Sequence, residues 1–290
     1  MKAASFEYHA PTTIEETVAL LREHGDDAKL LAGGQSLVPI LALRLARFAH
    51  LIDLNPVEEL SFITAASDYL SIGAMTRQAS AQASPQVATL APLLSRAIPF
   101  IGHFQIRNRG TIGGSIAHAD PASELPAVAS ALGAEMEICG PAGARRVPAE
   151  DFFSSVWETA VNPDEVLCAI QFPNWGEQSG FAIEELAWRP GDFAIAGALC
   201  AVHLDPSGRI ERAGLALMGM GPTPLRAEAA EAALIGVAPA EVALEELAEL
   251  AVAPTSPSDD VHASGAYRKQ VARGLVRRTL AAALREATGA

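Results

Sequence analysis

The sequence predicts an α+β protein with two domains. The first domain, residues 1–176, divides into subdomains of about 1–55 and 56–176, and the second, residues 177–290, combines a three-stranded antiparallel sheet with helices. Three observations predict this division. Helix and strand signals alternate in the first third, a Pro-Asn-Trp-Gly-Glu stretch at 173–177 forms a junction, and three apolar runs follow it before two or three helical segments close the chain.

The first subdomain is predicted as a small α/β unit. In order, we expect a helix over 14–24, a strand over 28–31, a helix over 37–45 and a strand over 50–54. Thr12 or Thr13 can cap the first helix and Gly25 can stop it. Ser36 can cap the second helix, after a turn at Gly33 and Gly34.

The second subdomain has weaker signals. We expect a strand over 69–74, a helix over 86–98, a helix from about Ser123, and strands over 134–139 and 165–172. Glycines punctuate the stretch from 102 to 114, which is therefore expected to be rich in loops.

The C-terminal domain is predicted from three apolar runs. Strands are expected over 180–188, 194–204 and 209–218, and helices over about 224–234, 240–252 and 267–286. The segment Asp205-Pro206-Ser207-Gly208 is the clearest hairpin turn.

Composition excludes several classes of function. The net charge is −13, with 34 acidic against 21 basic residues, so we expect no nucleic-acid partner. No stretch approaches the roughly 20 apolar residues of a membrane span, and we expect a cytoplasmic protein. Cys139, Cys168 and Cys200 are too widely spaced for a disulfide framework or an iron–sulfur site, and we expect buried thiols.

Two glycine turns carry the strongest functional signal. They are Ala32-Gly33-Gly34-Gln35-Ser36 and Thr111-Ile112-Gly113-Gly114-Ser115. Paired glycines reach positive φ and admit close approach, so successive N–H groups can form an anion-binding nest. Hydroxyls within the turns, and Arg107 and Arg109 ahead of the second, favour one phosphate-bearing cofactor. The alternative is structural: a tight strand-to-helix turn and a bulge that permits close packing.

Rival sites are disfavoured. No G-x-G-x-x-G opens a βαβ unit, because Gly219-Met220-Gly221 runs into prolines, and no Walker A sequence occurs. His103 and His118 flank the second glycine turn, but no third ligand has a recognisable spacing, so we expect no metal site. His118 is interpreted as an exposed loop histidine beside Asp120, an aspartate that caps a turn.

The glycine motifs together identify a resemblance. The segments 31–39, 43–47 and 106–121, with softer matches at 189–194 and 267–270, resemble the FAD-binding medium subunit of molybdenum hydroxylases. The resemblance covers essentially the whole chain. It is strongest to the carbon monoxide dehydrogenase medium-subunit group, within the FAD-binding fold typified by vanillyl-alcohol oxidase.

The resemblance implies a set of residues that bind FAD without a covalent bond. Both glycine turns are expected at the pyrophosphate and neighbouring groups, Ile101 packs on the cofactor, and Glu124 occupies a position that usually carries Asp at the adenosine end. Ser115 stands where Asn is common. Phe193 either shields the flavin ring or is the first core residue of a strand. The residues are Ala32, Gly33, Gly34, Gln35, Ser36, Ile101, Thr111, Gly113, Gly114, Ser115, Glu124 and Phe193.

The resemblance also implies a function. The chain would be the flavin component of a three-subunit oxidoreductase, with molybdopterin in a large subunit and 2Fe–2S clusters in a small one, and a dimer of such heterotrimers is expected. It would carry electrons from the clusters to an external acceptor. No catalytic residue is expected, because the cofactor carries the electrons. Two alternatives stay open: a free-standing flavin-dependent oxidase or dehydrogenase, and a non-catalytic scaffold that has lost the cofactor.

Overall fold

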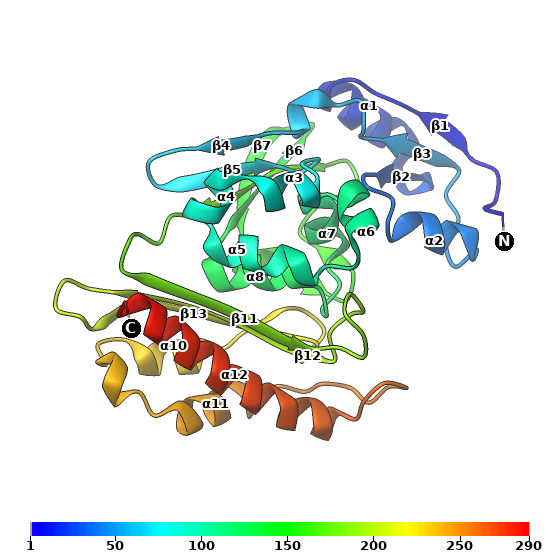
Figure 1. Ribbon diagram of the computed structural model, residues 1–290. Coiled ribbons are helices and arrows are strands. Elements are labelled where there is room, and N and C mark those ends of the chain that lie inside the picture. The colour runs from blue at the N-terminus through cyan, green and yellow to red at the C-terminus, as the bar shows by residue number, and fades with distance from the viewer. Residues whose placement is uncertain (1, 290) are drawn as a thin grey trace.

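A parallel sheet of three strands opens the fold (Figure 1). The computed structural model describes residues 2–289. The strands β1 (Glu7–His9), β2 (Ala28–Leu31) and β3 (His50–Asp53) are ordered β1-β3-β2 and accompany the helices α1 (Ile14–His24) and α2 (Leu37–Ala42). The predicted helices and strands are present here, and β1 was not predicted. The Thr13 hydroxyl caps α1 by accepting a hydrogen bond from the Glu16 N–H at 3.1 Å.

The predicted boundaries of α2 were partly wrong. Ser36 holds the cap position, but its backbone is helical (φ −103°, ψ −46°) and its hydroxyl accepts no capping bond, because a capping side chain needs an extended backbone to reach the second or third amide. The helix ends at Ala42 instead of continuing to residue 45, and Arg44 has a φ of 59°.

The central sheet has five antiparallel strands in the order β4-β5-β10-β6-β7. Its strands are β4 (Ile63–Ala65), β5 (Tyr69–Gly73), β6 (Glu135–Gly140), β7 (Gly143–Pro148) and β10 (Val166–Pro173), with a separate hairpin of β8 (Phe153–Ser155) and β9 (Glu158–Thr159). The helices are α3 (Gln78–Ala83), α4 (Pro85–Leu90), α5 (Pro92–Ala97), α6 (Phe104–Arg109), α7 (Ile112–His118), α8 (Glu124–Leu132) and α9 (Ala149–Phe152).

Two predictions for this region need correction. The predicted helix over 86–98 is two helices, because Pro92 lacks an N–H and the preceding Ala91 leaves the helical region (φ −135°, ψ 63°). The stretch expected to be rich in loops contains α6 and α7, so the second glycine segment lies mostly within a helix.

The C-terminal sheet is antiparallel in the order β11-β12-β13-β14. Its elements are β11 (Ser179–Leu186), β12 (Ala196–Leu204), β13 (Ile210–Met218), β14 (Leu225–Arg226), α10 (Glu228–Leu234), α11 (Leu244–Val252) and α12 (Gly265–Ala287). The three predicted strands are confirmed, and the Asp205 carbonyl accepts a bond from the Gly208 N–H at 2.9 Å in the predicted turn. The helix predicted over about 224–234 begins later than expected, because the short edge strand β14 occupies residues 225–226.

The C-terminal sheet is covered on both faces (Figure 1). Helix α12 lies against β11 and β12, while α5 and α8 of the central region contact β11, β12 and β13. The approach of α8 requires Gly214 in β13, since a Cβ there would lie 1.9 Å from the Ala131 carbonyl oxygen. One large buried cluster therefore runs from the central sheet into the C-terminal sheet.

The three cysteines are free thiols. Cys168 and Cys200 are buried and Cys139 is half-buried. Within residues 2–289, no helix is both long and apolar enough to cross a bilayer.

Candidate cofactor-binding site

A pocket of about 320 Å³ opens where β2 and β3 end. The carboxyl ends of parallel strands in open α/β sheets are the usual place for a ligand. The lining residues are Leu31, Ala32, Gly33, Gly34, Gln35, Val38, Pro39, Asp53, Asn55 and Arg109. Four predicted residues, Ala32 to Gln35, therefore line one cavity, and the other predicted residues lie outside this lining.

The two glycine segments are neighbours in space. A Cβ on Gly33 would lie 2.3 Å from the Arg109 carbonyl oxygen and 2.8 Å from the Gly110 Cα. A Cβ on Gly114 would lie 3.2 Å from the Ala32 Cβ. Close packing, against backbone at Gly33 and against the Thr111 and Ala32 side chains at Gly114, thus explains why these positions are glycine. Gly34 alone among the four paired glycines has a positive φ, of 73°.

The segments differ in the availability of their N–H groups. Among residues 2–289, nothing accepts a hydrogen bond from the backbone N–H of Gly33, Gly34, Gln35 or Ser36. These donors are thus available to an anion at the pocket.

The second segment corrects the expectation of two equivalent nests. The N–H groups of Ile112 and Gly113 donate to the carbonyls of Thr76 and Ala74, both at 2.9 Å. The N–H of Gly114 donates to the Thr111 hydroxyl at 3.0 Å, which caps α7. Since these donors are already satisfied, the glycines of this segment serve packing: a Cβ on Gly113 would lie 2.4 Å from the Ala74 Cβ.

The two arginines singled out in the sequence have different roles. Arg109 lines the pocket. Arg107 instead donates to the carbonyls of Ile101 and Gly102, both at 2.9 Å, and to the Gln82 side chain at 3.1 Å. Arg107 therefore holds a loop together and, unlike Arg109, does not line the pocket.

Sequence reasoning missed a polar network beside the pocket. Arg77 donates to the Asn55 side chain and to the Arg109 carbonyl. Asn55 in turn donates to the Ala32 carbonyl at 3.2 Å, and the Tyr8 hydroxyl donates to Asp53 at 2.5 Å. An Asp-x-Asn sequence after a predicted strand was the available signal, since polar residues at that strand end face a ligand crevice.

A second group of predicted residues gathers around the loop between β11 and β12. Gly191 packs on Gly102, where a Cβ would lie 2.9 Å from the carbonyl carbon, so this loop lies against the residue that follows Ile101. Ile101 is half-buried against the main core. Phe193 is 60% exposed and precedes β12, so its interpretation as a core residue is wrong and its ring is available to a ligand.

Two carboxyl groups from different regions are close enough to affect each other. Glu124, the first residue of α8, is buried, and burial raises its pKa to about 7, with a further contribution from Asp120. Burial and the neighbouring Glu124 raise the pKa of Glu185 in β11 to about 8. The Glu185 Oε2 is buried without a hydrogen-bond partner in the described part of the chain. Near neutral pH, both groups can therefore hold a proton and donate it in a hydrogen bond.

The interpretation of His118 as an exposed loop histidine was wrong. It ends α7, is half-buried and lies parallel to the Trp157 ring at a centroid distance of 6.1 Å. Burial lowers the pKa of His118. Asp120 does cap a turn, since its carboxylate accepts from the Ala122 N–H at 2.9 Å.

Free amides at a pocket, with a second glycine segment packed beside them, are typical of the class of proteins that bind an anionic cofactor. Comparison with known proteins specifies the cofactor. A family described as "FAD binding domain in molybdopterin dehydrogenase" matches residues 4–175, and the "CO dehydrogenase flavoprotein C-terminal domain" matches residues 181–283. The chain therefore belongs to the FAD-binding medium subunits of the molybdenum hydroxylase family.

Relatives match along nearly the whole chain. The medium chain of carbon monoxide dehydrogenase from Hydrogenophaga pseudoflava is 41% identical, with 96% of each chain covered. The alpha subunit of the 6-hydroxypseudooxynicotine dehydrogenase complex from Paenarthrobacter nicotinovorans is also 41% identical, over 99% of this chain and 97% of the relative.

Solved structures of related enzymes share the fold of this chain over nearly its whole length. A carbon monoxide dehydrogenase structure from Hydrogenophaga pseudoflava gives a TM-score of 0.95 at 42% identity over 99% of both chains. Quinoline 2-oxidoreductase from Pseudomonas putida 86 gives 0.90 at 34% identity, over 100% of this chain and 99% of that one. The predicted fold class, the FAD-binding domain and the assignment to an oxidoreductase subunit are thereby confirmed.

Proposed function

We propose that this chain is the electron-transfer flavoprotein subunit of a molybdopterin, iron–sulfur and flavin hydroxylase. A large molybdopterin subunit supplies electrons to the iron–sulfur clusters of a small subunit. The present chain takes these electrons from the clusters and passes them to an external acceptor. The observation that carries the proposal is the similarity to medium chains of such dehydrogenases over nearly the full length of this chain. A flavin supplies the chemistry for this task, because it exchanges both hydride and single electrons.

The described residues fit the phosphate portion of FAD. The free N–H groups of Gly33 to Ser36 bind the pyrophosphate at the pocket, and Arg109 offsets its charge. Arg77 fixes the segment that carries Arg109. The strongly acidic chain makes such local attraction necessary.

We propose further contacts at the other predicted residues. Ile101 packs against the cofactor, Phe193 shields the flavin ring, and Glu124 donates or accepts a hydrogen bond. Their clustering around the loop between β11 and β12, and the burial of Glu124, support these roles. Ala32 lines the pocket, and we propose that Thr111, Gly113, Gly114 and Ser115 complete the binding surface, with the two glycines allowing this segment to pack closely behind Ala32.

The proposed assembly is a dimer of heterotrimers in the cytoplasm. We also propose that residues 1–176 form the FAD-binding domain, with subdomains of about 1–55 and 56–176, and that residues 177–290 form the domain that covers the flavin. The separate sheets of the three parts support this division.

Isolation of the native complex tests the proposal. The expected result is flavin absorbance with one cysteine-rich and one much larger subunit in constant proportion. A preparation with neither flavin nor such partners contradicts it, and substrate-dependent flavin reduction by this chain alone supports a free-standing flavin enzyme instead. Gly34→Val is expected to lower FAD content, whereas Gly208→Val is a control with a comparable positive φ in open space. Equal FAD content in both variants shows that the first glycine turn is structural.

A further inference from the structure

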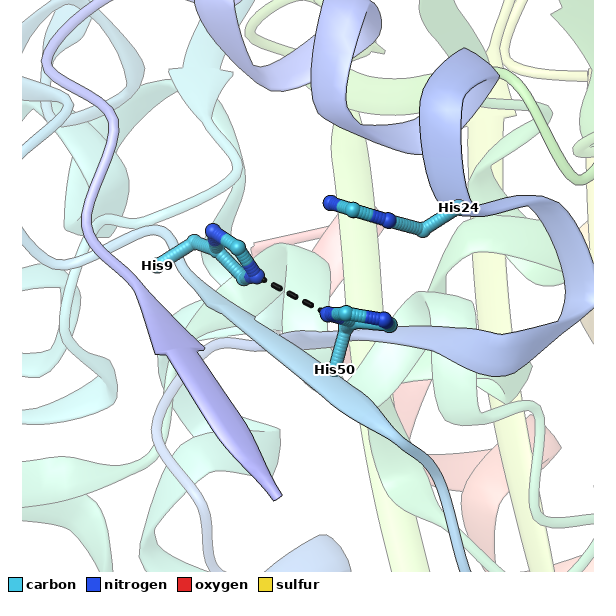
Figure 2. A group of neighbouring side chains, drawn as sticks. All are labelled: His9, His24 and His50. Atoms are coloured by element: carbon cyan, nitrogen blue, oxygen red, sulfur yellow. Dashed lines mark hydrogen bonds between the residues drawn. The ribbon is translucent and has the colours of Figure 1, made fainter.

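Three histidines meet at the N-terminal sheet, and none of them lines the pocket (Figure 2). His9 ends β1, His50 begins β3 and His24 ends α1. Strand periodicity places Glu7 and His9 on one face of β1, and the register pairs Glu7 with His50. Helix α1 covers this face through Leu21, which packs with Ile52 and Ala28. The fold thus brings three imidazoles together from three separate elements.

The rings are close enough to share one ion. One ring nitrogen of each histidine lies within 4.8 Å of the corresponding atoms of the other two. His9 Nε2 and His50 Nδ1 are 3.0 Å apart, and the rings of His24 and His50 stack at a centroid distance of 3.7 Å. Figure 2 shows ring nitrogens of all three residues bordering the same space. All three side chains are half-buried, so the space is sheltered but open to solvent exchange.

A carboxylate stands beside this group. The Glu7 Oε2 lies 3.6 Å from the His50 Nδ1. Within residues 2–289, the rings have no hydrogen-bond partner other than each other. The nitrogens that face one another, His9 Nε2 and His50 Nδ1 among them, therefore lose only their mutual hydrogen bond when they bind an ion.

We propose that His9, His24 and His50 form a binding site for a divalent transition-metal ion of the Zn²⁺ class, with Glu7 or water as the fourth ligand. Neutral imidazole suits zinc, and three protein ligands with one further oxygen complete a tetrahedron. Ligands at about 2.0–2.1 Å from zinc lie roughly 3.4 Å apart. The widest nitrogen pair therefore needs to close, and the stacked rings of His24 and His50 need to rotate so that their in-plane lone pairs converge on the ion. The half-buried side chains make both movements possible.

The site has a structural consequence for the N-terminus. An ion held by these residues ties β1 to both α1 and β3. Tyr8, between Glu7 and His9, points to the opposite face and donates to Asp53 at the pocket. The ion therefore also stabilises the strand that presents Tyr8 to the pocket, although the site does not depend on the proposed flavin function.

The test uses the full-length chain without an affinity tag. Zn²⁺ affinity is measured by competition with a chromophoric chelator, and Co²⁺ is substituted to record the coordination spectrum. We expect one ion per chain, the strong visible bands of tetrahedral Co²⁺, and a rise in Tm on addition of Zn²⁺. His9→Asn, His24→Asn and His50→Asn are each expected to weaken Zn²⁺ binding by about 100-fold or more, since even loss of an outer contact costs about 10–100-fold. Glu7→Gln is expected to weaken it by about tenfold.

His262→Asn is the matched control, because His262 is exposed and lies outside the group. It is expected to leave affinity, spectrum and Tm response unchanged. Equal Zn²⁺ binding by the wild type and the three histidine variants overturns the proposal. So does a thiolate band in the Co²⁺ spectrum, which assigns the ion to a cysteine, or the weak spectrum of six-coordinate Co²⁺ in the wild type. The wild-type spectrum decides the matter even for a variant that does not fold.

Discussion

Gly33 lies so close to Arg109 that a Cβ at position 33 would stand 2.3 Å from the Arg109 carbonyl oxygen. This contact joins the segment with free N–H groups to the segment that supplies the pocket arginine. The same carbonyl accepts a hydrogen bond from Arg77. The spacing of the two segments, and so the shape of the pocket, depends on a glycine at this position.

Gly33→Ala is therefore expected to force the segments apart. The free energy of unfolding should fall by about 1–3 kcal/mol, as for other overpacked sites, and FAD content should fall by at least about tenfold. Gly274→Ala is the control, because residue 274 has no positive φ and the nearest atom to its Cβ would be on the Arg278 side chain, at 3.8 Å. Urea denaturation and flavin absorbance of the purified variants measure both effects. FAD content equal to the wild type would show that this contact does not shape the cofactor site.

Arg77→Lys is expected to weaken FAD binding while the chain stays folded. Lysine keeps the charge but cannot span Asn55 and the Arg109 carbonyl with a planar fork. Loss of one charge-assisted hydrogen bond, about 1.5–3 kcal/mol, corresponds to roughly a 10–150-fold increase in Kd. Titration of flavin-free protein with FAD measures it. Arg22→Lys, an exposed residue outside the pocket, serves as the control, and an equal Kd in both variants contradicts the role of Arg77.

Stability is expected to fall as pH rises from about 5 to 8. Burial raises the pKa of Glu124 to about 7 and that of Glu185 to about 8, from the ordinary value of 4.5. Between pH 4.5 and the folded pKa values, the folded chain binds more protons than the unfolded chain. The contribution of these two groups to the free energy of unfolding is therefore complete below pH 4.5 and is lost as pH rises through the folded pKa values. For Glu124 the shift corresponds to about 3 kcal/mol.

Glu124→Gln removes that ionisation and should flatten the pH dependence. Urea midpoints at pH 5, 6, 7 and 8 measure the slope for the wild type and the variant. Glu246→Gln removes an exposed carboxylate and should leave the slope as it is. An unchanged slope in Glu124→Gln would show that Glu124 is ionised at neutral pH in the folded chain.

Two glycine substitutions are expected to have opposite effects. Gly214→Ala places a Cβ 1.9 Å from the Ala131 carbonyl oxygen, so α8 must move off the C-terminal sheet at a cost of about 3 kcal/mol or more. Gly274 lies inside α12 with only the Arg278 side chain nearby, at 3.8 Å, so Gly274→Ala should add about 0.5–1 kcal/mol. Thermal unfolding of both variants tests the pair, and two shifts of the same sign would contradict it.

The sequence alone determined the elements that have local signals. The helix after Thr13, the three strands around the Asp205 turn and the first glycine segment were predicted, because capping, apolar alternation and turn chemistry act over a few residues. The paired motifs also predicted the family, and the comparisons confirm it.

Tertiary structure alone decided how distant segments meet. It brought Gly33 into contact with Arg109, and it paired the N–H groups of the second glycine segment with the carbonyls of Thr76 and Ala74. It also placed Arg77 where its side chain bonds to two pocket residues, Asn55 and Arg109. It also assembled the three histidines, whose spacing matches no ligand motif. The physical reason is the same in each case: these contacts depend on sheet register and helix docking between segments far apart in the chain, and no local pattern encodes them.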